Sequence, residues 1–224
     1  MKLFIFSDIH TDWKTLEHLL GVEADYYIAA GDQLTWSKGV ERCGEILQSR
    51  GDKVYVLPGN HDVLAKRWTA TTNAFVQNFG PLATNFTCHG VLFLTLCDET
   101  LHDEHLAAEH PDCDPLGWLE RELKAAAGQP VIVVHHRPCG EDFHNNEFHP
   151  GWPGAFRQRW TDLVNRYGVR AEIVGHFHRD ELAWVGNVPV YVAAPLAGYY
   201  GRQASFRLYT WDGAHLSYRT IYPD

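Results

Sequence analysis

Short apolar runs alternate with amphipathic segments along most of the chain. Residues 2–6 form an apolar run that ends at Ser7, and apolar side chains then recur at helical spacing over residues 13–20. The same order of strand, loop and helix recurs at residues 26–47 and 54–79. Strands that read as continuous apolar runs between helices are typical of a largely parallel sheet covered on both faces. The pattern therefore predicts an α/β fold.

The predicted elements continue this alternation through residue 174. We expect strands at residues 2–6, 26–30, 54–57, 91–96, 131–134 and 171–174. We expect helices at residues 13–20, 40–47, within 63–79, at 115–127 and at 156–167. Residues 99–114 and 139–155 fit no element, and long irregular segments of a compact domain are often functional loops. We expect that role for both.

The pattern changes beyond Glu181. Short strand patterns appear there, separated by turn signals at Gly186 and Gly213, at residues 182–185, 188–193, 205–211 and 215–221. This arrangement predicts an antiparallel meander. Because no stretch resembles a linker, we expect residues 1–224 to form a single domain.

Five short polar motifs follow apolar runs. They are Asp8-Ile9-His10, Gly31-Asp32, Gly59-Asn60-His61-Asp62, His135-His136 and Gly175-His176-Phe177-His178. Ligands bind beyond the carboxyl ends of parallel strands, which is where these motifs fall. Each motif alone is a weak signal, since Gly-Asp and Gly-Asn occur in ordinary turns and an isolated histidine is usually a half-buried polar residue. Together they offer oxygen and imidazole ligands, and two divalent cations about 3.5–4 Å apart can clamp a phosphoryl group and ionise water.

The spacing within the motifs adds geometry to this hypothesis. Side chains of an extended backbone alternate with a period of two, so Asp8 and His10 project to the same side, and the His176 motif repeats that spacing. One carboxylate has to lie between two cations, and Asp32 is the candidate. Asn60 offers an amide oxygen, and His135 completes an imidazole-rich pocket with His176.

This ordered set resembles the calcineurin-like metallophosphoesterase superfamily, whose pattern is Asp-x-His, Gly-Asp, Gly-Asn-His-Asp/Glu, His and Gly-His-x-His, over residues 8–178. The resemblance implies a four-layer α/β/β/α sandwich. It implies one metal held by Asp8, His10, Asp32 and His178, and a second held by Asp32, Asn60, His135 and His176. It also implies that His61 lies near the leaving-group or a phosphoryl oxygen, and that Asp62 supports His61.

Two departures from the family pattern change the expectations. Many members carry an acidic residue where this chain has Thr35, and the arginine that follows in protein phosphatases is absent, which argues against protein dephosphorylation. Family members often read His-x-Pro in the fourth motif, whereas this chain reads His135-His136-Arg137-Pro138. We choose His135 as the ligand because it comes first after the apolar run, with His136 as the alternative.

Two arginines stand next to proposed ligands. Arg137 and Arg179 are therefore candidates for binding phosphate oxygens. Arg179 is followed by Asp180 and Glu181, so a local ion pair is the alternative for it.

Charge and cysteine usage limit the classes of binding partner and the cellular compartment that we expect. The formal net charge of −9 argues against binding of long nucleic acids, whose affinity comes mainly from Lys and Arg, but is compatible with a small phosphorylated substrate. The five cysteines are odd in number and lack Cys-x-x-Cys spacing, which favours a reducing compartment. The first apolar run is too short for a signal-peptide core, and no stretch approaches a membrane span. We expect a cytoplasmic protein without a membrane partner.

The resulting hypothesis is a two-metal phosphoesterase in which a metal-bridging hydroxide attacks phosphorus, and small phosphodiesters are the favoured substrates. The alternatives are a phosphomonoesterase acting on nucleotides or other small metabolites, and a non-catalytic scaffold. Mixed imidazole, amide and carboxylate ligands suit manganese, iron or zinc, and also cobalt or nickel, better than magnesium. The physiological substrate, the metal pair and the oligomeric state stay open.

Overall fold

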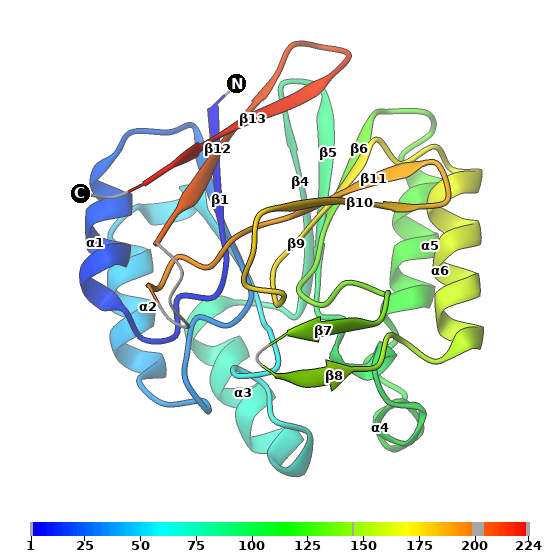
Figure 1. Ribbon diagram of the computed structural model, residues 1–224, viewed down its shortest axis with the longest axis horizontal. Helices are drawn as coiled ribbons and strands as arrows, with labels where there is room; N and C mark the ends of the chain where they lie inside the picture. The colour runs from blue at the N-terminus through cyan, green and yellow to red at the C-terminus, as the bar shows by residue number, and fades with distance from the viewer. Residues whose placement is uncertain (1, 145, 199–203, 223–224) are drawn as a thin grey trace.

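Two β-sheets lie face to face between two layers of helices in the computed structural model, which describes residues 2–144, 146–198 and 204–222 (Figure 1). Within these ranges the first sheet has the strand order β13-β12-β1-β2-β3. Its strands are β1 (Lys2–Phe6), β2 (Tyr26–Ala30), β3 (Val54–Leu57), β12 (Phe206–Trp211) and β13 (Leu216–Ile221). Strands β1, β2 and β3 are parallel, and β12 runs antiparallel to β1.

The second sheet has the order β10-β11-β9-β6-β5-β4 in the described part of the chain. Its strands are β4 (Ala83–Cys88), β5 (Val91–Leu96), β6 (Val131–Val134), β9 (Ala171–Val174), β10 (Glu181–Val185) and β11 (Val188–Val192). Strands β5, β6, β9 and β11 are parallel, while β4 and β10 pair antiparallel at the two edges. A separate hairpin consists of β7 (Asp142–His144) and β8 (Glu147–His149).

The helices cover the outer faces of the two sheets. They are α1 (Trp13–Gly21), α2 (Val40–Gln48), α3 (Trp68–Phe79), α4 (Glu104–Glu109), α5 (Pro115–Ala125) and α6 (Gly154–Arg166), with 3-10 turns at Gly51–Lys53, Ala65–Arg67 and Glu99–Leu101. Aspartate side chains cap the starts of three of them: Asp12 caps α1, Asp103 caps α4, and Asp114 caps α5 just before Pro115. In the described residues we find no helix with the length and apolar character needed to span a bilayer.

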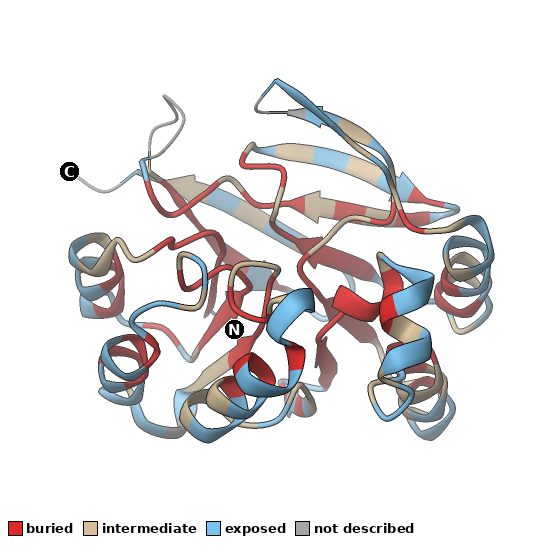
Figure 2. Ribbon diagram, turned by 90° about the horizontal axis from the view of Figure 1, so that it is seen from below, coloured by how far each residue is buried: buried red, intermediate tan, exposed pale blue. Residues whose placement is uncertain are grey.

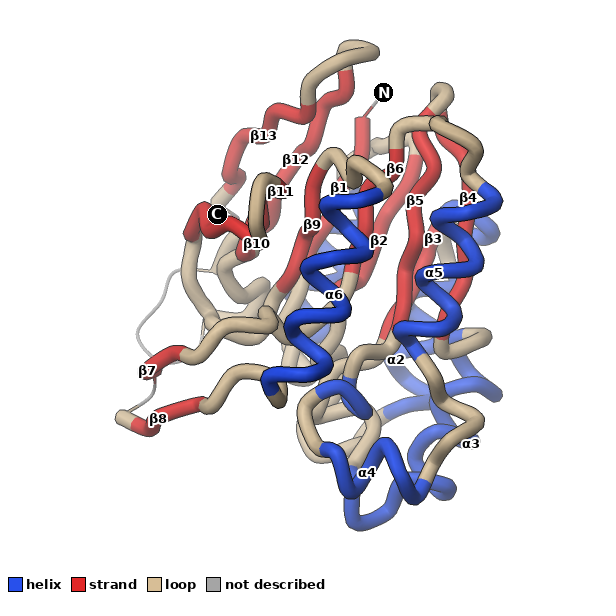
Figure 3. Tube along the Cα trace, turned by 90° about the vertical axis from the view of Figure 1, so that its right-hand side faces the viewer, coloured by secondary structure: helices blue, strands red, loops and turns tan. Residues whose placement is uncertain are grey.

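Three apolar cores hold the layers together. Helices α1 to α3 pack on one face of the first sheet, and α5 and α6 pack on the outer face of the second (Figure 3). The third core lies between the sheets and includes Ile5, Phe93 and Ile132. Figure 2 shows the buried residues gathered in the strands and on the inner sides of the helices. The expected four-layer α/β/β/α sandwich is confirmed.

The C-terminal region differs from the expected meander. Its two hairpins complete different sheets, because β11 pairs parallel to β9 whereas β12 pairs antiparallel to β1. The pattern of short strands was correct, but a strand pattern carries no information about which sheet a hairpin joins. The sequence also failed to indicate strand β4 and the short elements within residues 99–114 and 139–149.

The core between the sheets allows a test of stability. Phe93 is fully buried and stacks on Phe86 at a ring distance of 5.0 Å. We expect Phe93→Ala to lower the free energy of unfolding by about 3–5 kcal/mol, because it leaves a cavity where two sheets meet. Phe143, which is 66% exposed, is the matched control, and Phe143→Ala should change the urea midpoint little. Equal midpoints for both variants would contradict this description of the core.

Candidate metal centre

The loops that follow the strands of both sheets are joined by hydrogen bonds. The backbone N–H of Asp8 donates to the carbonyl of Gly31 at 3.0 Å, and that of His10 donates to the carbonyl of Asp32 at 3.0 Å. Across the sheets, the N–H of His176 donates to Asp8 Oδ2 at 3.1 Å. The polar motifs that follow β1, β2 and β9 therefore meet at one end of the sandwich.

The backbone at this end is strained. Asp8, His10, Asp32, His176 and His178 have φ values of 56°, 45°, 54°, 67° and 51°. A residue with a Cβ pays roughly 1–2 kcal/mol in this left-handed region. Such strain persists where the surrounding structure imposes it, and it is concentrated at functional sites. These five candidate ligands thus share an unusual backbone conformation that orients their side chains.

Two glycines make room for the side chains. A Cβ added at Gly59 would lie 2.4 Å from Asp32 Oδ1, and one added at Gly175 would lie 2.8 Å from Asp8 Oδ2. Neither distance is possible for real atoms, so only glycine allows the loops to approach these carboxylates.

The first group of converging side chains contains Asp8, His10 and His178. His178 Nε2 lies 3.2 Å from Asp8 Oδ1 and 3.2 Å from His10 Nε2. All three residues are buried, and their ligand atoms lie within 4.8 Å of one another. This grouping contains three of the four residues that were expected to hold one metal, and the fourth, Asp32, has Oδ2 at 4.0 Å from His10 Nε2.

The second group contains Asp32, His136 and His176, again within 4.8 Å. His136 Nε2 lies 3.2 Å from Asp32 Oδ2, and His136 Nδ1 donates to the carbonyl of Ala30 at 2.9 Å. That carbonyl fixes the ring so that Nε2 faces the carboxylate. Asp32 also belongs to a third group with His10 and His61, so its carboxylate lies between the imidazoles of both sides.

The electrostatics of the cluster favour ionised carboxylates. Burial by itself raises the pKa of Asp32, but the imidazoles of His136, His61 and His10 outweigh it and hold that pKa well below its usual range. Burial likewise opposes ionisation of Asp8, and His178 outweighs it and lowers the pKa of Asp8. The cluster therefore presents negative oxygens among imidazole nitrogens.

This donor set fits two transition-metal ions. Imidazole and carboxylate ligands suit manganese, iron and zinc, and a shared carboxylate can supply one oxygen to each of two cations. The two groups on either side of Asp32 provide such an arrangement in the part of the chain that the structure describes. Asp8, His10, Asp32 and His178 would hold one ion, and Asp32, Asn60, His136 and His176 the other.

In the part of the chain that the structure describes, His135 does not join this cluster, whereas His136 does, and we therefore propose His136 in place of His135 as the ligand. His135 is fully buried, with Nδ1 2.9 Å from Asp98 Oδ2 and Nε2 3.2 Å from Glu172 Oε2. Burial opposes its charged form, but the hydrogen bonds with the two carboxylates outweigh burial and raise the pKa of His135 to about 9. In the described structure this imidazole lies between two buried carboxylates and away from the candidate ligands.

The two arginines have different surroundings. Arg137 Nε donates to Asn60 Oδ1 at 3.3 Å and lies 3.3 Å from Glu99 Oε1, so its guanidinium reaches the edge of the cluster. Arg179 instead forms ion pairs with Asp142 and Glu181, at 2.6 Å to each. The local ion pair that the sequence left open for Arg179 is the one observed, and this pairing does not support a role in binding substrate.

His61 and Asp62 also behave differently from each other. The imidazole of His61 lies against His10 at a ring distance of 4.8 Å, and burial lowers its pKa. Asp62 does not bind the His61 ring in the described structure. Its carboxylate accepts the backbone N–H groups of Gly59, Gln33 and Leu34 at 2.9, 3.2 and 2.8 Å, and thereby ties two motif loops together. The expected support of His61 by Asp62 is therefore indirect.

Sequence reasoning missed two buried carboxylates beside the site. Asp98 Oδ2 accepts from His135 and from the backbone N–H of Arg137 at 2.7 Å, and Glu172 accepts from Trp160 at 3.0 Å. Both residues could have been found from the sequence, because Asp98 follows the apolar run of β5 closely and Glu172 interrupts the apolar run of β9.

The two irregular segments both reach the neighbourhood of the cluster. Residues 99–114 bring Glu99 to Arg137, and residues 139–155 place His149 at a ring distance of 5.7 Å from His176.

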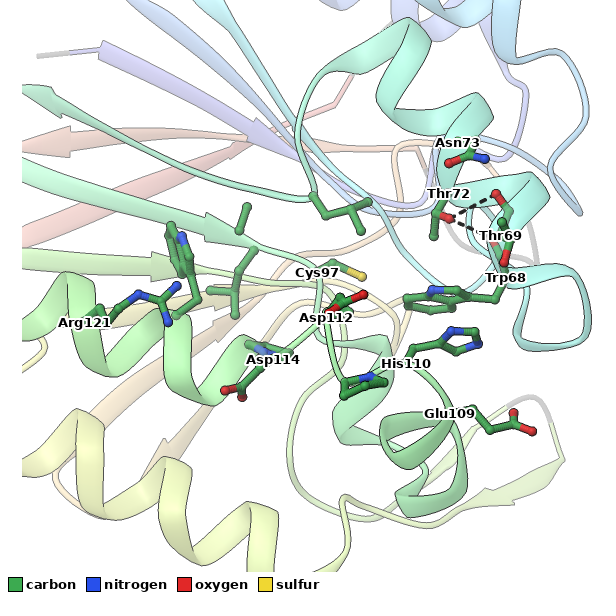
Figure 4. A pocket seen from close by; sticks show the side chains of 17 residues that line it. Trp68, Thr69, Thr72, Asn73, Cys97, Glu109, His110, Asp112, Asp114 and Arg121 are labelled. Atoms are coloured by element: carbon green, nitrogen blue, oxygen red, sulfur yellow. Dashed lines mark hydrogen bonds between the residues drawn. The ribbon is translucent and has the colours of Figure 1, made fainter.

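A cavity of about 700 Å³ opens elsewhere, between α3 and α5 (Figure 4). Trp68 stacks on His110 there at a ring distance of 5.1 Å. The described residues that line it include none of the cluster's carboxylates and imidazoles. This cavity is therefore separate from the candidate metal centre.

Comparisons with known proteins show the family and the fold of this chain. The calcineurin-like phosphoesterase family model matches residues 1–180. Serine/threonine-protein phosphatase CPPED1 of Rattus norvegicus is 27% identical over 153 residues, which cover 66% of this chain and 48% of that protein. The chain thus spans about half the length of the curated relatives it matches.

Solved structures share the fold. A dimetal phosphatase from Danio rerio has a TM-score of 0.73 at 12% identity, covering 98% of this chain and 95% of that one. Purple acid phosphatase PPD1 from yellow lupin has a TM-score of 0.67 at 14% identity, covering 98% of this chain and 51% of that one.

Substitution of the two adjacent histidines distinguishes their roles. Loss of a residue that only hydrogen-bonds to a metal ligand weakens metal binding by roughly 10- to 100-fold. Because His136 is proposed as a ligand itself, we expect His136→Ala to weaken metal binding by more than this. His135→Ala should retain metal but lose about 3–5 kcal/mol of unfolding free energy, because Asp98 and Glu172 stay buried without the imidazole that lies between them. Elemental analysis and urea unfolding measure the two effects. Loss of metal in the His135 variant alone would restore the original choice.

Proposed function

Because this chain belongs to the calcineurin-like phosphoesterase family, we propose that it hydrolyses small phosphodiesters at a centre of two metal ions. The observation that carries the proposal is the position of Asp32. Its carboxylate lies between imidazoles that come from both sheets, within reach of His10 and His61 on one side and His136 and His176 on the other. A shared carboxylate between two such groups is what a pair of cations requires.

The metals supply the main electrostatic contribution. When bound, two divalent cations neutralise phosphoryl oxygens and lower the pKa of a coordinated water to near neutrality. The ligand types favour manganese, iron or zinc, with cobalt or nickel also compatible. The task of the protein is to hold the ligands in place, and the strained loops and Asp62 do so.

His61 is the proposed acid for the leaving group. Its ring lies next to His10, and Nδ1 is buried without a hydrogen-bond partner in the described structure. The N–H of His61 donates to Asp32 Oδ1 at 2.8 Å, which fixes the residue beside the shared carboxylate. An imidazole at this position can stabilise or protonate the departing oxygen.

The charge around the cluster supports diesters over monoesters. A monoester dianion benefits from cationic side chains beyond the metals, and Arg137 and Arg179 are the candidates. Arg179 is neutralised by Asp142 and Glu181, and Arg137 lies against Glu99. A diester carries one negative charge fewer and depends less on such residues.

Phosphomonoester hydrolysis is the second candidate. Arg137 donates to Asn60, so its guanidinium is within reach of a phosphoryl group bound there. The curated relatives are named serine/threonine-protein phosphatases, although this chain spans about half of their length. We therefore treat monoester substrates as the alternative in the assay below.

We also propose a cytoplasmic location. All five cysteines are free thiols, which fits a reducing compartment.

A parallel assay tests the preference. Protein reconstituted with manganese should hydrolyse bis(4-nitrophenyl) phosphate with a kcat/KM at least about tenfold above that for 4-nitrophenyl phosphate, a difference of about 1.4 kcal/mol in transition-state binding. Chelation with EDTA should abolish both activities, and manganese should restore them. A higher kcat/KM for the monoester would favour the second candidate. Absence of both activities, with fewer than one bound ion per chain, would favour a scaffold.

Substitution of His61 tests the acid. We expect His61→Ala to lower kcat by about 10²- to 10⁴-fold for the diester while both metals stay bound. His215, whose side chain is 85% exposed, provides the matched control, and His215→Ala should leave kcat unchanged. Wild-type turnover in the His61 variant is the result that would remove the acid role.

A further inference from the structure

An exposed tryptophan packs against the proposed acid. Trp36 is 58% exposed, and its indole lies over the ring of His61 at a centroid distance of 4.2 Å with a tilt of 40°. The N–H of the next residue, Ser37, donates to the carbonyl of His61 at 2.7 Å. The indole and the imidazole are therefore held together by both side-chain and backbone contacts.

The backbone conformation of the turn that contains Trp36 is unfavourable for a bulky side chain. Trp36 and Ser37 have φ values of 53° and 58° in a tight turn closed by the bridge between Thr35 and Lys38. Two successive positive φ angles favour glycine or asparagine, and a bulky residue there is an outlier. The side chain is not buried in the core either. Neither turn chemistry nor burial accounts for a tryptophan at this position.

Trp36 is the outermost ring of a row that leads into the cluster. His61 lies 4.8 Å from His10, and His10 lies 5.2 Å from His178, both as ring-centroid distances. A leaving-group oxygen that meets His61 thus carries its substituent toward the exposed indole. On the other side of the cluster, Arg137 and Glu99 present charged groups near Asn60. The two sides of the cluster therefore differ in chemistry: aromatic rings lie beside His61, and charged groups lie beside Asn60.

We propose that Trp36 is a platform on which the leaving group of the substrate stacks, and that the preferred esters carry a planar aromatic ring there, either aryl or nucleobase. This inference rests on the proposed function, because it assigns the leaving group to the side of His61. An indole face accepts any planar ring, since stacking does not depend on a particular pattern of hydrogen bonds.

Kinetics with two leaving groups test the platform. Methyl 4-nitrophenyl phosphate has an aromatic leaving group, and methyl trifluoroethyl phosphate does not. We expect Trp36→Ala to lower the ratio of kcat/KM for the first ester to that for the second by roughly 5- to 150-fold, the range of stacking on an aromatic side chain. Trp36→Phe should retain most of the ratio. General damage to the site lowers kcat/KM for both esters alike and therefore cancels in the ratio.

Trp184 provides the matched control. It is 62% exposed and lies on edge strand β10, and no contact of the described residues joins it to His61. Trp184→Ala should leave the ratio unchanged. An unchanged or increased ratio in Trp36→Ala would overturn the proposal. A larger loss for the trifluoroethyl ester would mean that the indole only positions His61, because the more basic alkoxide depends more on the acid.

Binding measurements give a readout that does not depend on turnover. Calorimetry with phenylphosphonate, an adenosine phosphonate and methylphosphonate should show that Trp36→Ala weakens one or both aromatic ligands relative to methylphosphonate. The ligand that loses more affinity identifies the source of the ring as aryl or nucleobase. Unchanged relative affinities would overturn the platform. Hydrolysis of neither ester by the wild type, with ring-dependent binding intact, would contradict the proposed function and leave the platform standing.

Discussion

The buried carboxylate of Asp32 is the point on which this site depends. It follows strand β2 of the first sheet, and its neighbours include imidazoles delivered by both sheets. A buried carboxylate is costly unless positive charge compensates it, and the surrounding imidazoles supply part of that compensation. A pair of bound cations would complete it. The spacing of the two sheets and the conformation of the loops at their ends therefore have to place these imidazoles around the carboxylate of Asp32.

The fold satisfies this requirement through its backbone. Left-handed residues at Asp8, Asp32 and His176 turn the chain sharply where the strands end, and Gly59 and Gly175 allow carboxylates to approach the backbone. Asp62 then ties the loops of the second and third motifs through three backbone N–H groups. Because strain of this kind has to be balanced elsewhere, the apolar cores on both faces of the sheets stabilise the site as well as the fold.

The surroundings of the centre suggest how it selects a substrate. Arg137 lies against Glu99, and Arg179 pairs with Asp142 and Glu181, so bound metals would be the main source of positive charge at the proposed centre. The exposed indole of Trp36 adds an apolar surface beside His61. Together these features favour a substrate with modest charge and a planar group.

The sequence by itself determined most of the strands and helices and the order of the candidate metal-binding motifs, because apolar runs and the polar residues that end them are local signals. It could not choose between His135 and His136. Both follow an entirely apolar strand, and such a strand does not reveal which face meets the other sheet. His135 continues the face of Val131 and Val133, toward the helices, and His136 continues the face of Ile132 and Val134, toward the first sheet. Only the packing of the two sheets decided which face met Asp32, because adjacent residues of a strand point in opposite directions.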